Sequence, residues 1–267
     1  MSIDSITNSQ WEIIGIFFCG FIGLAVGSFL NVVIWRVPND MSIIRPSSHC
    51  PKCNEPIRSL DNIPVLSYVV LGGKCRNCSN KISFRYPFIE LLTCFVWIFT
   101  FIRLDAHIST IGYLLFFSGL LALSAIDIDT KLLPKKIVYP IGALLVVFLS
   151  ADSIINQNYK QILDCLLVGL AYSAFLFVVW FATGGKAMGF GDVRLALFLG
   201  FAMGYFGFVV SYMGMLASFA IGSFIGIAIA AITQKGRKMK IPFGPFLAAG
   251  TVIAIWYAPQ IHDLFQI

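Results

Sequence analysis

Long apolar runs alternate with short polar connections along almost the whole chain. Crossing a hydrocarbon core takes about 20 helical residues, and a helix satisfies its backbone hydrogen bonds within one segment. The pattern predicts an all-α polytopic membrane protein with about eight transmembrane helices. The predicted spans are 12–35, 87–103, 109–128, 137–151, 161–183, 194–211, 213–233 and 243–259.

Two places leave the number of spans open at seven or nine. The fourth run is short and contains Pro140, and the sixth and seventh runs touch between Gly207 and Gly214. Composition agrees with the membrane interpretation, because 58% of the residues are hydrophobic, 12% are charged and the mean hydropathy is +0.85. A soluble domain of this length would carry about twice that charged fraction.

The basic residues predict the orientation of the spans. With these boundaries, 17 of the 19 Lys and Arg fall in loops on one side, and only Arg103 and Lys160 fall on the other. Basic loops face the cytoplasm, so both termini should face outward, and the first run should be a retained span. The net charge of +6 fits a surface beside anionic membrane lipid and requires no nucleic acid.

A polar loop between the first two spans contains four of the seven cysteines. Cys50 and Cys53, then Cys75 and Cys78, form two C-x2-C pairs, a spacing typical of a structural zinc site. Two disulfides or a redox pair are the alternative, which the reducing side of the membrane disfavours. The chain is thus divided into a first span (1–35), a cytoplasmic zinc loop (36–86) and a multi-span core (87–267).

Acids at the ends of apolar runs are the second candidate site, because charged groups at membrane depth are costly. Asp127 and Asp129 end the third span, and Asp192 follows Gly189 and Gly191 in a G-x-G-D sequence at the start of the sixth. Two carboxylates held close together share one proton and supply an acid and a base. The glycines would permit close backbone approach and unusual backbone angles.

Alternative interpretations attach to these acids. Asp127 and Asp129 could belong to a solvated helix end beside lysines, and Glu90 and Asp164 are expected to be helix-packing acids. A transporter could use intramembrane acids to relay protons or cations, and a zinc-stabilised assembly protein would need no catalytic acid. Position near the inner surface favours the aspartate pair over a transporter.

The motifs, taken in order, resemble the type IV prepilin leader peptidases, also called prepilin peptidase/N-methyltransferases. The resemblance covers most of the chain. It rests on these segments: Gly27–Ile34 with Arg36 and Pro38, the paired C-x2-C loop, Asn62–Tyr68, Ile82–Pro87 with Glu90–Thr93, Ile126-Asp127, Leu133-Pro134, Gly189–Asp192 and Ile241–Phe246.

The resemblance implies an aspartyl endopeptidase of the bacterial inner membrane with its active site facing the cytoplasm. It would remove a short basic leader from type IV prepilins or pseudopilins, cleaving after a glycine. The resemblance assigns catalysis to Asp127 and Asp192, with Asp129 as the alternative first acid. It also suggests methylation of the new amino terminus with S-adenosylmethionine. Lys135 departs from the family, in which many members have an acid after Leu-Pro.

Overall fold

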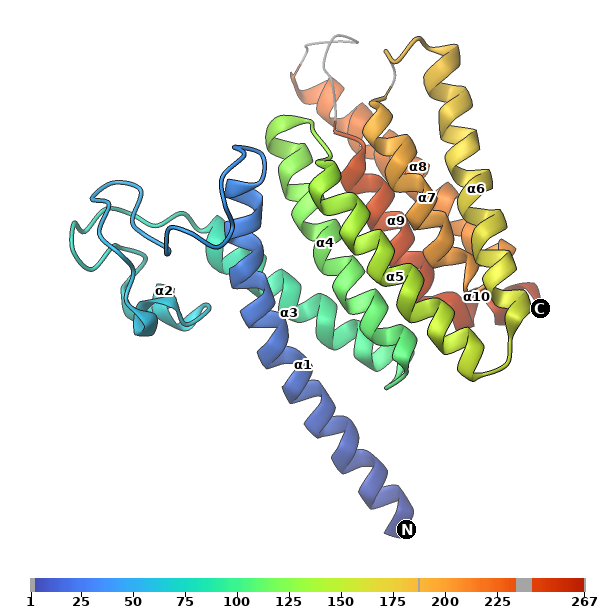
Figure 1. Cartoon of the computed structure of the whole chain (residues 1–267), viewed down its shortest axis with the longest axis horizontal. Helices are drawn as coiled ribbons and strands as arrows, with labels where there is room; N and C mark the ends of the chain where they lie inside the picture. Colours follow the sequence, from blue (N-terminus) through green and yellow to red (C-terminus); the bar gives the residue numbers. More distant parts are fainter. Residues whose placement is uncertain (1–2, 187, 234–241, 267) are drawn as a thin grey trace. The chain divides into compact units, whose positions relative to one another are not determined.

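The structure is a computed structural model and describes residues 3–186, 188–233 and 242–266. Within these ranges every element is helical, which confirms the predicted all-α class (Figure 1). The elements are α1 (Ile3–Arg36), η1 (Ser59–Asn62), α2 (Leu66–Val70), α3 (Arg85–Leu104), α4 (Ile108–Thr130), α5 (Lys135–Ile155), α6 (Tyr159–Ala182), α7 (Phe190–Gly204), α8 (Phe208–Thr233), α9 (Gly244–Trp256) and α10 (Ala258–Phe265).

Six of the described helices, α1, α3, α4, α5, α6 and α8, are long and apolar enough to cross a membrane. The predicted total of eight spans is not confirmed, because α7 and α9 have only 15 and 13 residues. At 1.5 Å per residue they extend about 22 and 20 Å, short of the roughly 30 Å of a hydrocarbon core. The basic residues Lys235, Arg237, Lys238 and Lys240, which the sequence assigns to an inner loop, lie outside the described residues.

The predicted sixth span extends to residue 211, but α7 ends at Gly204. The chain turns at Gly207, whose φ of +95° is rarely accessible to residues with a side chain. The end of the apolar run therefore belongs to α8. Hydropathy registers the run but not the turn inside it.

The chain divides into two compact units, Met1–Ala106 and His107–Ile267. In the first unit α1 packs closely against α3 through small residues. A Cβ at Gly23 would lie 2.9 Å from Cα of Cys94, and one at Gly27 would lie 2.7 Å from Cα of Glu90. Glycines spaced four apart thus let two membrane helices approach each other.

In the second unit α7 contacts α5, α6, α8 and α9 and is largely buried. Its packing against α6 is close, because a Cβ at Gly200 would lie 2.8 Å from Cα of Gly169 and one at Gly204 would lie 2.7 Å from Cα of Cys165. The surrounding helices hold the start of α7 in a fixed position. The functional division into residues 1–35, 36–86 and 87–267 stays a prediction.

A buried acid that the sequence did not single out ties several helix ends of the second unit together. Asp152 of α5 is 5% exposed and accepts hydrogen bonds from the backbone N–H of Ser109, the amide of Asn156 and the hydroxyl of Tyr205. These bonds join α5 to the start of α4 and the residue after α7. We interpret Asp152 as structural, since its carboxylate is fully engaged.

Candidate active site and metal centre

Asp127 lies in the last turn of α4, and its side chain is 5% exposed. Its Oδ2 accepts a hydrogen bond of 3.0 Å from the backbone N–H of Gly244, the first residue of α9. The start of a helix presents free N–H groups and a partial positive charge. The carboxylate of Asp127 is therefore held at the junction of α4 and α9.

Asp192 lies in the first turn of α7, and its side chain is 6% exposed. Its Oδ2 accepts a hydrogen bond of 3.2 Å from the backbone N–H of Gly189, the residue that precedes α7. An acid at this position caps the helix and interacts favourably with its dipole. The G-x-G-D sequence thus has a local structural use as well as a candidate chemical one.

Leu133, in the connection between α4 and α5, approaches a glycine next to each acid, namely Gly191 before Asp192 and Gly244, which donates to Asp127. A Cβ at Gly191 would lie 3.0 Å from Cβ of Leu133, and one at Gly244 would lie 3.4 Å from Cδ2 of Leu133. The charge of Asp127 also acts on Asp192. The structure therefore brings the two predicted acids, 65 positions apart in the sequence, to one end of the helical unit.

The third candidate acid, Asp129, is exposed, in contrast to the buried Asp127. Residues two apart on a helix lie on nearly opposite faces, so one helix cannot direct both carboxylates to the same site. Burial and the bond from Gly244 favour Asp127 as the partner of Asp192.

The sequence missed Tyr172, which stands in the apolar run of α6. Its side chain is 5% exposed, and its hydroxyl has no hydrogen-bond partner within the described part of the chain. Tyr172 lies close enough to Asp192 for an electrostatic interaction between the two side chains. The neighbouring Ser173 donates a hydrogen bond to the carbonyl of Val193. No pattern of polar residues marks this tyrosine, so only the packing of α6 on α7 reveals it.

The two glycines before Asp192 do not adopt the unusual backbone angles expected of them. Gly189 has φ −80°, and Gly191, inside α7, is not among the residues with positive φ. The other expected use, close approach of the backbone to a substrate strand, stays a prediction; within the chain, a Cβ at Gly191 would lie 3.0 Å from Cβ of Leu133. A Cβ at Gly189 would meet its nearest atoms at 3.8 Å, an ordinary contact.

The four-cysteine loop folds into two knuckles with the same backbone geometry. The N–H of Cys50 bonds to the carbonyl of Glu55, and that of Cys75 bonds to the carbonyl of Asn80. The residue after each pair, Asn54 or Ser79, has positive φ and donates its N–H to the first cysteine's carbonyl. Each knuckle therefore turns both of its thiols toward one point.

The four sulfur atoms, contributed by Cys50, Cys53, Cys75 and Cys78, all lie within 4.8 Å of one another. The Sγ atoms of Cys50 and Cys78 are 3.8 Å apart. Four thiolates at about 2.3 Å around a tetrahedral zinc ion would be about 3.8 Å apart, so the cluster fits a metal better than disulfides. Backbone N–H groups of Cys53 and Lys52 lower the pKa of Cys50 to about 6, whereas burial and the neighbouring thiols raise the pKa of Cys53 to about 11, so one thiolate of this pair forms readily and a bound metal would have to deprotonate the other.

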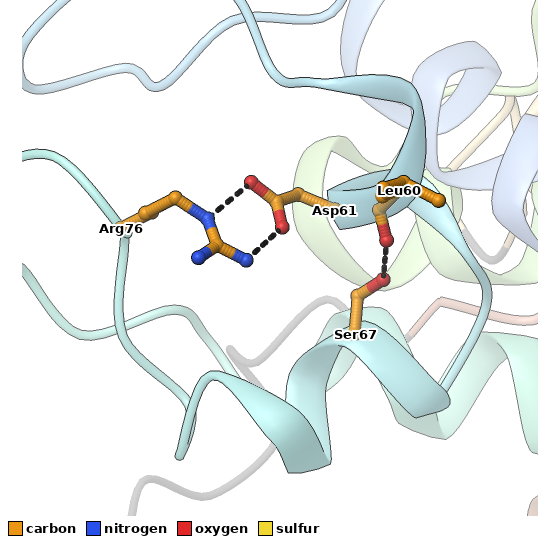
Figure 2. A network of polar contacts seen from close by, with 4 residues as sticks. All are labelled: Leu60, Asp61, Ser67 and Arg76. Carbon is orange, nitrogen blue, oxygen red and sulfur yellow. Dashed lines mark hydrogen bonds and ion pairs between the residues drawn. The ribbon is translucent and has the colours of Figure 1, made fainter.

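An ion pair fastens the second knuckle to η1 (Figure 2). Arg76, between Cys75 and Cys78, donates from Nε and Nη2 to the two carboxylate oxygens of Asp61 at 2.9 and 2.6 Å. The guanidinium lowers the pKa of the Asp61 carboxyl by hydrogen bonding to its charged form. In the same view Ser67 of α2 donates to the carbonyl of Leu60, which joins α2 to η1.

Removing this ion pair should have a small effect. Asp61→Asn is expected to lower the zinc affinity of the loop by less than about fivefold, because solvent-accessible ion pairs contribute little. The measurement is competition with a chelator of known zinc affinity. A loss of zinc comparable to that of a cysteine variant would show that the ion pair, rather than the thiolates, holds the loop in place.

Comparison with known proteins identifies both halves of the chain. Residues 21–104 match the model of the bacterial peptidase A24 N-terminal domain, and residues 114–231 match that of the type IV leader peptidase family. No solved structure matches the chain significantly.

Relatives align over nearly the whole chain. A prepilin leader peptidase/N-methyltransferase of Aeromonas salmonicida is 33% identical over 87% of this chain and 88% of its own. The protein of that description from Pseudomonas aeruginosa is 34% identical over 90% and 89%. A type 4 prepilin-like proteins leader peptide-processing enzyme of Escherichia coli is 33% identical over 88% and 91%. The chain therefore belongs to the type IV leader peptidase family.

Proposed function

We propose that this protein is a membrane aspartyl endopeptidase that removes the leader from prepilins or pseudopilins. The observation that supports this function is that two buried acids, Asp127 and Asp192, lie at helix ends whose adjoining glycines, Gly244 and Gly191, both approach Leu133. Family membership and the activity named for the relatives favour the same reaction. Asp127 and Asp192 are proposed as the catalytic pair, with Gly189, Gly191 and Asp129 outside the proton transfers.

The acid pair can perform hydrolysis by general acid and base catalysis. The ionised carboxylate takes a proton from a water molecule, and the water oxygen attacks the peptide carbonyl carbon. The protonated carboxyl group meanwhile donates a hydrogen bond to the carbonyl oxygen. The resulting tetrahedral species expels the amide nitrogen, which receives, as the carbon–nitrogen bond breaks, the proton that the first carboxylate took from water. The products are the leader's new carboxyl terminus and the pilin's new amino terminus.

We place this reaction at the cytoplasmic face of the inner membrane. Lys131 follows Asp127 by four residues, Arg194 follows Asp192 by two, and the zinc loop is rich in basic residues. Basic segments beside membrane helices favour the cytoplasmic side. A substrate with a basic leader ahead of an apolar helix would have its cleavage site at that interface, so the bond would reach the acids without being drawn into the bilayer.

We also propose methylation of the new amino terminus, as the names of the relatives suggest. S-adenosylmethionine, when bound, would supply the methyl group, which the deprotonated amine accepts with release of S-adenosylhomocysteine and a proton. The four thiolates are assigned a structural zinc ion, because they fill a tetrahedral coordination sphere and leave no position for water.

Two other functions are less well supported. A transporter would need its acids along a passage through the membrane, whereas Asp127 and Asp192 both lie at helix ends. A zinc-stabilised assembly protein would have no need of two buried acids brought together. Homology also favours the peptidase over both.

A reconstituted cleavage assay tests the proposal. The purified protein in lipid vesicles is incubated with a synthetic prepilin, and the products are identified by mass spectrometry. We expect one cut that separates the basic leader from the apolar segment, and no cut in the Asp127→Asn, Asp192→Asn double variant. A wild-type protein that leaves the prepilin intact would contradict the proposal. Labelled S-adenosylmethionine in the same assay tests the methyl transfer.

Gly244→Ala should damage the site without altering an acid. The added Cβ would lie 2.8 Å from Oδ2 of Asp127, so the carboxylate must move away from the α9 N–H that holds it. We expect a decrease of about 10- to 100-fold in cleavage, since small displacements of catalytic groups cost about this much. The measurement is kcat/KM for the synthetic prepilin.

Gly189→Ala is the matched control, because its Cβ has ordinary room and its φ suits alanine. The fold predicts less than about a threefold change for this variant. Unchanged cleavage by Gly244→Ala would contradict the proposed contact. A large loss in Gly189→Ala alone would mean that bound substrate, rather than the fold, requires the glycine.

A further inference from the structure

Arg36, the last residue of α1, is a buried cation. Its side chain is 6% exposed. Nη1 donates to the carbonyl of Ser42 at 3.0 Å and Nη2 to that of Ser47 at 3.5 Å, the long end of the range. No carboxylate in the described part of the chain forms an ion pair with it. Burying an uncompensated charge is costly, so the position favours an anion from outside the chain.

The guanidinium lines a pocket of about 380 Å³ in the first unit. Its walls combine hydroxyl and amide groups, from Ser28, Ser48 and Asn62, with apolar side chains such as Phe29 and Ile44. Small-molecule sites have volumes of about 300–1,000 Å³ and combine apolar walls with a few polar groups. The pocket is therefore suited to a small molecule with both an anionic end and an apolar or aromatic part.

A buried acid of α3 lies next to part of the pocket lining. The carboxyl group of Glu90 accepts a hydrogen bond of 2.7 Å from the backbone N–H of Val65. Ser28 and Pro64, the neighbour of Val65, both line the pocket. A ligand with a carboxylate toward Arg36 and a cationic centre toward Pro64 would match this arrangement.

We propose that this pocket is the S-adenosylmethionine site and that Arg36 pairs with the carboxylate of the ligand. The inference rests on the proposed methyl transfer and assigns its cofactor to a place in the first unit. S-adenosylmethionine carries the required carboxylate, a cationic sulfonium and an adenine ring. The phosphate of an anionic lipid could also pair with a guanidinium, and the experiment separates the two sources.

The test is calorimetric binding of S-adenosylmethionine to the full-length protein in detergent. We expect Arg36→Gln to weaken binding by about 30-fold or more, as expected when one member of a buried charged pair is removed. Arg58→Gln removes an exposed arginine of the same loop and should bind like wild type. Zinc content and the circular dichroism spectrum check that each variant is folded.

A ligand that lacks the carboxylate tests whether Arg36 and this carboxylate interact directly. Decarboxylated S-adenosylmethionine should bind wild type about 30-fold more weakly than the parent compound, and should bind Arg36→Gln no more weakly than wild type. If Arg36→Gln is poorly folded, Asn62→Asp adds a repelling carboxylate at an exposed position of the pocket. That variant should weaken binding of the parent compound but not of its decarboxylated form.

Three results would overturn the assignment. The first is equal binding by wild type and Arg36→Gln, and the second is indifference of wild type to the ligand's carboxylate. The third is a lipid result in native mass spectrometry. Phosphatidylglycerol, but not phosphatidylcholine, would occupy a site that depends on Arg36, and S-adenosylmethionine would not compete for that site. Wild type that binds no S-adenosylmethionine and transfers no methyl group would instead refute the proposed methyl transfer, and intact leader cleavage would leave the peptidase proposal standing.

Discussion

Asp192→Asn is expected to reduce prepilin cleavage by about 10³-fold or more, and Asp127→Asn by a similar factor. Asparagine keeps the size of the side chain and an oxygen that can still accept the N–H bonds from Gly189 or Gly244. It cannot take up or release the proton that hydrolysis needs, so the loss falls on the chemical step. The measurement is kcat/KM for a synthetic prepilin, together with the thermal stability of each variant in detergent.

Asp129→Asn is the matched control for this experiment. It makes the same chemical change two residues from Asp127, on an exposed side chain, and should alter cleavage by less than about threefold. An inactive Asp129→Asn beside an active Asp127→Asn would transfer the catalytic role to Asp129. Normal cleavage by Asp192→Asn would reject the acid pair altogether.

The choice between Asp127 and Asp129 shows how far the sequence alone could reach. Helical spacing predicts that the two acids lie on nearly opposite faces of the helix. It does not predict which of them faces the protein interior. That depends on α9, which begins 117 residues after Asp127 and supplies the N–H of Gly244. A contact of that sequence separation has no local signature, so the sequence alone left both acids as candidates.

The number of membrane helices was less predictable for a related reason. Hydropathy measures how apolar a segment is, and it does not distinguish a helix that faces lipid from one that faces other helices. The best apolar window of α8 is 6% buried and that of α4 is 72% buried, although both were predicted as spans. The short α7 is largely buried, so its apolar sequence fits packing against other helices and does not require that the helix cross the membrane.

The four-cysteine loop was predictable because its chemistry is local. Two C-x2-C pairs specify the ligands by spacing alone, and the structure brings the four sulfur atoms together as expected. Tyr172 was not predictable as a site residue, since its burial depends on the packing of α6 on helices that are distant in sequence. Arg36 is held by Ser42 and Ser47, which are near in sequence, but no spacing pattern marks it as a pocket residue. Ligand spacing within one loop was therefore informative, whereas burial and contacts between helices required the structure.

The second large effect is expected at the metal centre. Among residues 37–84 only Cys50 and Ser67 are buried, and large apolar side chains such as Ile44 and Leu60 are about four-fifths exposed, at 80% and 78%. A segment with so little buried apolar surface lacks the free energy to order its backbone. Zinc binding contributes about 10–16 kcal/mol in small structural sites, enough to fold such a segment.

The Cys50→Ser, Cys75→Ser double variant should therefore lose its zinc and the order of the loop together. We expect zinc content, measured by mass spectrometry of the metal, to fall from about one ion per chain to less than about a tenth. Limited proteolysis should then cut within residues 37–84 at least about tenfold faster, because an unfolded segment is open to proteases. Cys94→Ser, which removes a thiol of α3 outside the cluster, should keep both its zinc and its protease resistance. A double variant that retains a full zinc ion would refute the tetrathiolate site, and one that loses zinc but stays resistant would show that the loop folds without metal.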